Sequence, residues 1–377
     1  MSIRPLLSTL LAASTLVPSA FAVTETPRLI ETRPGTRIWS TKAQREALSR
    51  RAHGEGRCGG FRDLTNFRIS RNALAPPRMD LAGREPKEQA RVIPLLKEAN
   101  EGNLIAVITK LSAFHDRYYQ NQGGVDAATW LKSRFEAIGH GRNDVKVDFF
   151  AHPDFRQPSV IAEIAGHGPQ KNEVVVIGGH LDSINNQDEK NGAAPGADDN
   201  ASGIATVLET FRILVESSYA PNRTILFMGY AGEEEGLLGS GEIASWFRNK
   251  NRVVIGALQF DMTFYSDHAK SITFITDHTD RDLTRFDERL VDEYVKAPWT
   301  EDECGYGCSD HASWTAAGYA SSMPFETSFN DHNPAIHSPD DTLKGLDPAH
   351  GVRFLKLAIA HAVELAEARA QVWRVIR

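Results

Sequence analysis

A buried strand followed at once by charged side chains is the feature that most constrains this chain. The run Val174–Ile177 is apolar and β-branched, and a pair of glycines ends it, which is typical of a strand inside a sheet. His180 and Asp182 follow at a spacing that puts both side chains on one face of extended backbone. A polar loop with Asp198–Asp199 then leads into an apolar pattern at helical spacing. The segment predicts a strand–loop–helix unit with its polar groups at the carboxyl end of the strand, where open α/β sheets bind ligands.

Strand and helix patterns alternate along the rest of the chain. Strands are expected at 145–150, 159–164, 173–178, 224–230, 253–261, 271–276 and 319–325, and helices at 103–119, 125–138, 200–217, 236–249, 281–295, 310–317 and about 349–368. This alternation predicts an α/β fold, with a mostly parallel central β-sheet flanked by helices on both faces. The length of 377 residues suits one large domain with an additional segment.

The first part of the chain differs in charge from the rest. Residues 23–100 contain 16 Lys and Arg against 9 Asp and Glu, a net charge of +7, whereas residues 101–377 contain 25 against 40, a net charge of −15. The acidic main domain argues against nucleic acid as a partner. Residues 23–90 look irregular apart from a helix expected at 41–51, and they suit either a surface extension or a propeptide. We favour the propeptide because a basic segment is attracted to an acidic site, which leaves 91–377 as the main domain.

The amino terminus has the pattern of a secretory signal peptide. Arg4 supplies a positive charge, residues 6–17 are apolar, and Ala20–Phe21–Ala22 is a small-x-small cleavage site. The apolar run is too short to span a bilayer, and no later stretch is long enough. We therefore expect residues 1–22 to be a signal peptide that is cleaved near Ala22. The mature protein is expected to be secreted or periplasmic, without a membrane span.

Further strand ends and one loop carry groups that suit a metal site. Glu233–Glu235 follows strand 224–230, Asp261 closes strand 253–261, and His337 lies in a proline-framed loop. Each has an ordinary alternative: a solvated helix start, a solvent-facing strand end or helix N-cap, and a plain loop histidine. Three adjacent carboxylates repel one another, however, and a cation at the shared sheet edge would relieve this repulsion. Two imidazoles and three carboxylates suit two zinc ions that one carboxylate bridges.

Six stretches together resemble one known family. The chain resembles the secreted bacterial leucyl aminopeptidases of the M28 metallopeptidase family, of the Vibrio/Aeromonas type, over roughly residues 91–370. The stretches that carry the resemblance are HLDS at 180–183, APGADDNASG at 194–203, AGEEEGLLGS at 231–240, LQFDM at 258–262, CGYGCSDHASW at 304–314 and MPFETSFNDHNPAIH at 323–337. The resemblance implies a zinc-peptidase fold and an enzyme that hydrolyses N-terminal residues from peptides with a free N-terminus.

The resemblance also implies a role for each metal-site residue. Asp199, rather than Asp198, matches a carboxylate that bridges two zinc ions, and its peptide bond to the next residue is expected to be cis. His180 and Asp261 match the other ligands of one zinc ion. The remaining matches are Glu234 and His337 to ligands of the second zinc ion, Glu233 to the general base, and Asp182 to the residue that orients the His180 ring.

A disulfide and an apolar pocket are implied in the same way. Cys304 and Cys308, already the obvious pair among three cysteines, match a disulfide beside the pocket, which leaves Cys58 alone. The pocket would hold the first side chain of the substrate and favour Leu-like residues. His332 departs from the family pattern, because it stands where the Vibrio-type enzymes have Tyr. The matching pocket positions are Met262, Ile275, Tyr306, Met323, Phe325, Phe329 and Ile336.

The prediction from sequence is therefore a secreted, di-zinc aminopeptidase made as a zymogen and active as a monomer. A single-zinc glutaminyl cyclase on the same fold is the nearer alternative, and the complete ligand set with its adjacent Glu argues against it. A non-catalytic binding module is the alternative from another class. The presence of every ligand position argues against that module.

Overall fold

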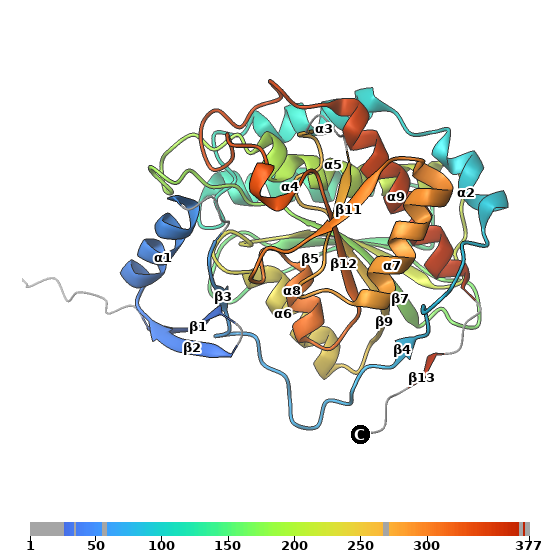
Figure 1. The fold of residues 1–377 in the computed structure, drawn as a ribbon, viewed down its shortest axis with the longest axis horizontal. Helices are drawn as coiled ribbons and strands as arrows, with labels where there is room; N and C mark the ends of the chain where they lie inside the picture. The colour runs from blue at the N-terminus through green and yellow to red at the C-terminus, as the bar shows by residue number, and fades with distance from the viewer. Residues whose placement is uncertain (1–25, 34, 55–58, 267–270, 369–371, 374–377) are drawn as a thin grey trace, which may run out of the picture.

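An eight-stranded sheet forms the centre of the molecule (Figure 1). The computed structural model describes residues 26–33, 35–54, 59–266, 271–368 and 372–373. The strand order is β11-β10-β12-β9-β7-β8-β6-β5. The strands are β5 (Val145–Phe150), β6 (Ser159–Ile164), β7 (Glu173–His180), β8 (Thr224–Tyr230), β9 (Val253–Gln259), β10 (Ile272–Ile275), β11 (Trp299–Asp302) and β12 (Ser321–Phe325).

Parallel pairing is concentrated at the middle of this sheet. Strands β12, β9, β7 and β8 pair in parallel, as do β10 and β11. The pairs β10–β12, β6–β8 and β5–β6 are antiparallel, so the sheet is mixed. The predicted α/β class is confirmed. The antiparallel edge arises because β5 connects to β6 through a loop and not through a crossover helix.

Helices cover both faces of the sheet (Figure 1). One core includes side chains of β7 such as Val175 and Ile177, and the other includes Val174 and Val176. Strand β7 is thus buried on both faces, which explains its continuous apolar run. The first core packs helices α3 (Glu101–Ser112), α4 (Gln122–Gly139), α5 (Gly203–Glu216), α7 (Arg281–Leu290) and α9 (Pro348–Glu367), and the second packs α6 (Leu238–Asn249) and α8 (His311–Ala316).

Several predicted helices differ from the observed ones at their ends. The helix predicted at 103–119 ends at Ser112, and the following residues form an irregular segment in which Tyr118 is buried. The Asp116 carboxylate accepts a hydrogen bond from the Tyr118 N–H there, which competes with a helical path. Short helical turns also occur at η1 (Ala197–Ser202), η2 (Val291–Val295) and η3 (Phe329–Asp331). In η1, Asp199 and its neighbour have non-helical backbone angles, so regular helix begins only at α5.

The expectation that residues 23–90 are irregular is wrong for much of this segment. Strands β1 (Arg28–Arg33) and β2 (Thr36–Ser40) form an antiparallel hairpin, and β3 (Arg62–Asp63) pairs with β1. The predicted helix is present as α1 (Lys42–Gly54). These strands are rich in charged residues and give only a weak alternating pattern. The segment continues through β4 (Arg78–Met79), which pairs with β13 (Val372–Trp373), to α2 (Gln89–Leu96).

Some predicted features fall outside the described residues. The signal peptide at 1–22 and Cys58 belong to this part of the chain. Among the helices that the structure does describe, none combines the length and the apolar character needed to cross a membrane.

Candidate metal centre

The predicted metal-site residues meet at the carboxyl edge of the central strands. His180 is the last residue of β7, Glu234 follows β8, and Asp261 lies just past β9. Asp199 comes from η1, and His337 comes from the loop before α9. All five side chains are buried. The folding pattern that was expected from the strand ends therefore brings five sequence-distant groups into one centre.

Asp199 lies at the middle of this centre. Its Oδ1 is 3.0 Å from His180 Nε2, and its Oδ2 is 2.8 Å from His337 Nε2. Asp261 Oδ1 lies 3.2 Å from His180 Nε2, and Glu234 Oε2 lies 3.1 Å from His337 Nε2. Asp199 therefore belongs to two groups of side chains whose donor atoms are close enough to hold a cation. These groups are His180, Asp199 and Asp261, and Asp199, Glu234 and His337.

Acidic charge dominates the electrostatics of the centre. Burial is the largest single effect on His180 and lowers its pKa, but the surrounding acids, with Asp261 and Glu233 first among them, together raise the pKa well above the usual value. His337 behaves likewise, with Glu234 and Asp199 as the acids. Burial, followed by the charge of Asp199, raises the pKa of Glu234 to about 7. Without a metal ion, the buried carboxylates of the centre are neutralised by protons that the carboxylates and the imidazoles bind. Metal cations can neutralise the carboxylates in place of these protons. Buried imidazole nitrogens and carboxylate oxygens are ligands that metal ions such as zinc accept, so the residues fit a metal centre.

Asp182 supports this centre through its carboxylate. Its Oδ1 accepts a hydrogen bond from the Glu233 N–H at 3.0 Å, and its Oδ2 accepts one from the Glu234 N–H at 3.2 Å. The His180 Nδ1 atom lies 3.2 Å from the Asp182 main-chain oxygen and 3.5 Å from the carboxylate. Asp182 thus contacts the ring that it was predicted to orient, and it also fixes the loop that carries two adjacent glutamates.

Ser309 is a supporting residue that the sequence reasoning missed. Its hydroxyl donates a hydrogen bond of 2.6 Å to Asp261 Oδ2. The neighbouring Asp310 accepts a hydrogen bond from the Gln259 side chain at 3.0 Å. Both Ser309 and Asp310 lie inside the stretch 304–314, which carries part of the family resemblance. The resemblance therefore pointed to this stretch, but it gave no role to these two residues.

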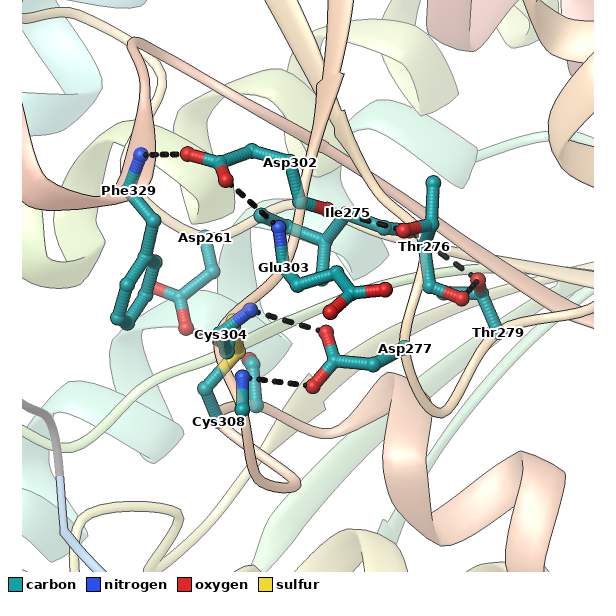
Figure 2. Close-up of a disulfide and its surroundings, with 12 residues drawn as sticks. Asp261, Ile275, Thr276, Asp277, Thr279, Asp302, Glu303, Cys304, Cys308 and Phe329 are labelled. Carbon is teal, nitrogen blue, oxygen red and sulfur yellow. Dashed lines mark hydrogen bonds between the residues drawn. A yellow bond between two sulfur atoms is a disulfide. The ribbon is translucent and has the colours of Figure 1, made fainter.

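An apolar pocket adjoins the metal centre. The predicted disulfide joins Cys304 and Cys308, and Figure 2 shows it close to Asp261. The Asp277 carboxylate holds the disulfide loop by accepting the Cys304 N–H at 2.9 Å. The predicted pocket residues pack with both cysteines in one buried cluster. The cleft itself is lined by Asp261, Met262, Cys308, Met323, Phe325, Phe329, His332 and Ile336.

Comparisons with known proteins decide the family. The profile described as Peptidase family M28 matches residues 159–362. The chain belongs to peptidase family M28. A probable leucine aminopeptidase of Arthroderma otae is 38% identical over 342 residues, which cover 90% of this chain and 92% of that one. A probable leucine aminopeptidase of Arthroderma benhamiae is 39% identical over 311 residues, which cover 81% and 85%.

Solved structures agree with this assignment to family M28. The LapA aminopeptidase of Legionella pneumophila is 33% identical, with a TM-score of 0.77, over 88% of this chain and 91% of that one. A glutaminyl cyclase of Bacteroides thetaiotaomicron shares the fold at 16% identity and a TM-score of 0.54, over 71% of this chain and 98% of that one. The family and the aminopeptidase relatives make this M28 peptidase a metallo-aminopeptidase, and the candidate metal centre fits that activity. The fold alone would not separate it from a cyclase.

Glu233 lies beside the candidate metal ligands of this M28 peptidase. It is buried, and it forms a third group of donor atoms with His180 and Glu234. Burial raises the pKa of Glu233 well above its usual value; the charge of His180 lowers it, and that of Glu234 raises it further. A carboxylate with a raised pKa has the proton affinity that a general base needs.

Proposed function

We propose that this chain is a secreted aminopeptidase that uses two zinc ions to remove Leu-like residues from the N-termini of peptides. The observation that carries the proposal is the position of Asp199, whose carboxylate oxygens face His180 and His337 at 3.0 and 2.8 Å. The relatives named as probable leucine aminopeptidases support the substrate class. The mixture of nitrogen and oxygen donors supports zinc.

Each proposed ion has its own set of ligands, and one ligand is shared. His180, Asp199 and Asp261 would hold one ion, and Asp199, Glu234 and His337 would hold the other. Zinc ions in such a centre polarise the scissile carbonyl and lower the pKa of a water molecule. The buried acids around the centre would also attract the free α-amine of the substrate, which would favour cleavage at the N-terminus.

Glu233 is the proposed general base. It would take a proton from the attacking water as the water oxygen bonds to the carbonyl carbon. It would then give that proton to the leaving amine nitrogen as the carbon–nitrogen bond breaks. Asp182 would keep Glu233 in place, because it accepts the hydrogen bond of the Glu233 main-chain N–H.

The pocket predicts a preference that a substrate series can test. Met262, Met323 and Phe325 are buried apolar walls, so charged side chains would lose hydration without gaining partners. We expect kcat/KM for leucine p-nitroanilide to exceed that for the lysine and glutamate p-nitroanilides. A preference for either charged substrate would refute the pocket assignment. Zinc binding without hydrolysis of any of the three would favour a non-catalytic binding module.

His332 is expected to adjust this preference. Its Nδ1 lies 2.6 Å from the Phe329 carbonyl oxygen, which can only accept, so Nδ1 is the donor and Nε2 is an acceptor whenever the ring is neutral. Because His332 lines the pocket, this acceptor suits a substrate that carries a donor, such as the hydroxyl of tyrosine. We expect H332F to lower the ratio of kcat/KM for tyrosine over phenylalanine p-nitroanilide. The exposed Glu303 gives a control, E303Q. An unchanged ratio in H332F would exclude this role.

Residues 1–22 are proposed to be a signal peptide, and residues 23–90 a propeptide. Two contacts support the second proposal. The Asp63 N–H donates to the Gly236 oxygen at 2.8 Å, and Phe61 is buried against Gly236. The segment thus lies on the loop that carries Glu233, where it would hinder access of a peptide.

Controlled proteolysis tests the propeptide. We expect hydrolysis of leucine p-nitroanilide to rise as residues 23–90 are removed, with mass spectrometry giving the new N-terminus and the state of the disulfide. Loss of activity on removal would instead make the segment a permanent part of the enzyme. That result would fit the LapA structure, which covers more of this chain than residues 91–377 make up.

A further inference from the structure

The backbone that leads into Asp199 is held from one side by a buried arginine. Arg117 is fully buried and donates hydrogen bonds to the main-chain oxygens of Pro195 and, at 2.9 Å, of Gly196. The same guanidinium donates to the main-chain oxygen of Leu181 at 2.8 Å, directly after β7. One buried side chain therefore connects, through hydrogen bonds, the loop that follows β7 with the start of the segment 195–199.

A buried carboxylate holds the same backbone from its amide side. The Asp341 carboxylate accepts the Asp198 N–H at 3.0 Å and the Asp199 N–H at 3.1 Å. The Asp341 main-chain oxygen accepts the Ala197 N–H at 3.2 Å. Three consecutive main-chain N–H groups thus donate hydrogen bonds to one residue. Asp341 also lies in the loop that carries His337, so it connects two of the segments that supply metal-ligating side chains.

The two side chains complement each other across the segment. Burial lowers the pKa of Arg117 to about 10, and Asp341 is the acid that opposes this most. The guanidinium therefore stays charged at neutral pH. Arg117 supplies donors to the carbonyl groups, and Asp341 supplies acceptors to the amide groups. The peptide groups of 195–199 therefore have one favourable orientation. Turning the carbonyl groups away from Arg117, or the N–H groups away from Asp341, would leave buried polar groups without hydrogen bonds.

Glycine at position 196 allows this close contact. Its φ is +53°, which L side chains rarely adopt, and an added Cβ would lie 2.7 Å from Arg117 Nη2 and 2.5 Å from the Asp199 oxygen. No side chain fits between the guanidinium and the backbone at this point. The main chain at Gly196 is therefore in direct contact with the Arg117 guanidinium.

We propose that Arg117 and Asp341 are positioning residues that clamp the backbone of 195–199 so that the Asp199 carboxylate faces both His180 and His337. This inference rests on the proposed function in one respect, because it takes Asp199 to be a metal ligand. The clamp acts on the direction of the carboxylate and touches neither the substrate nor the metal ions.

Zinc affinity, measured by competition with a chelator, tests the clamp. D341N keeps the size of the side chain, but its amide nitrogen would oppose one of the two N–H groups. R117K keeps the charge but loses the planar fork of donors. We expect both variants to bind zinc about 10–100-fold more weakly, the usual cost of losing a partner that orients a ligand. The control is D340N, because Asp340 is the exposed neighbour of Asp341, and it should bind zinc like the wild type.

The zinc-free variants separate positioning from a purely structural role. Urea unfolding without zinc gives the stability of each variant, and zinc affinity is then measured where the protein is folded. For D341N we also expect excess zinc to restore much of kcat. Wild-type zinc affinity in folded D341N would overturn the clamp, whatever its stability. If R117K does not fold, D341N decides the result alone. A wild type that binds zinc but does not hydrolyse leucine p-nitroanilide would refute the proposed function and leave the clamp testable.

Discussion

Replacing Glu233 with Gln is expected to lower kcat by about 10²–10⁴-fold, the contribution that a positioned general base usually makes. The glutamine side chain has nearly the same shape but cannot accept the proton of the attacking water. The expected change in KM is small, because Glu233 acts on the water and not on the pocket. Steady-state kinetics with leucine p-nitroanilide measure both constants.

The zinc content of E233Q distinguishes a base from a ligand. Glu233 also forms a group of donor atoms with His180 and Glu234, so geometry by itself allows it to bind a cation. As a base, its loss should leave the number of bound zinc ions unchanged. A variant that loses a zinc ion together with its activity would make Glu233 a ligand, and the base would then have to be sought elsewhere.

Glu235 provides the matched control for this substitution. It is the next residue along the chain and lies 3.3 Å from the Tyr118 hydroxyl. Burial raises the pKa of Glu235 to about 8, so its side chain is mostly protonated at neutral pH and resembles glutamine. E235Q should therefore change kcat little. A loss in E235Q as large as that in E233Q would show that the whole loop, and not one carboxylate, had been disturbed.

The strand ends of the candidate site could be predicted because a buried strand has a clear signature. The apolar run of β7 contributes to both cores, so its sequence is hydrophobic on both faces and ends sharply at His180. The carboxyl edges of β8 and β9 follow the same rule. The charged hairpin of β1 and β2 lacked such a run, and its strands were therefore missed.

The supporting residues were harder to predict, because their roles depend on backbone direction. Apolar residues at helical spacing continue as far as Tyr118, so the pattern predicted a helix through Arg117, although α3 ends at Ser112. Asp340 and Asp341 are chemically identical neighbours, yet one is exposed and the other is buried against the amides of 198 and 199. Only the tertiary path of a loop decides which member of such a pair faces inward.

Replacing Asp199 with Asn is expected to remove both zinc ions and to reduce hydrolysis of leucine p-nitroanilide to background. Asn keeps one carbonyl oxygen, but its amide nitrogen replaces the other oxygen and carries no negative charge. Because the two oxygens of Asp199 face His180 and His337 separately, both proposed metal sites lose charge. The loss of zinc affinity should exceed the roughly 10–100-fold that is typical of residues that only orient a ligand.

The adjacent acid should behave differently. The Asp198 carboxylate accepts the Phe264 N–H at 3.2 Å and the Asn333 side-chain amide at 3.0 Å, so it stabilises the fold around the centre. An amide at this position would face one of those donors with a donor of its own. We expect D198N to lower the free energy of unfolding of the zinc-free protein by about 1–3 kcal/mol, as measured in urea, and to keep both zinc ions. If D198N instead lost both zinc ions and D199N kept them, the bridging carboxylate would be Asp198.

Zinc stoichiometry then tests whether Asp199 is a bridge or an ordinary ligand. Asp261 belongs to only one of the two groups that share Asp199. D261N should therefore lose one ion and keep the other, whereas D199N should lose both. If Asp199 served a single ion, the two variants would each retain one. Metal analysis after dialysis against a weak chelator gives the two counts directly, and equal counts would contradict a shared carboxylate even if both variants were inactive.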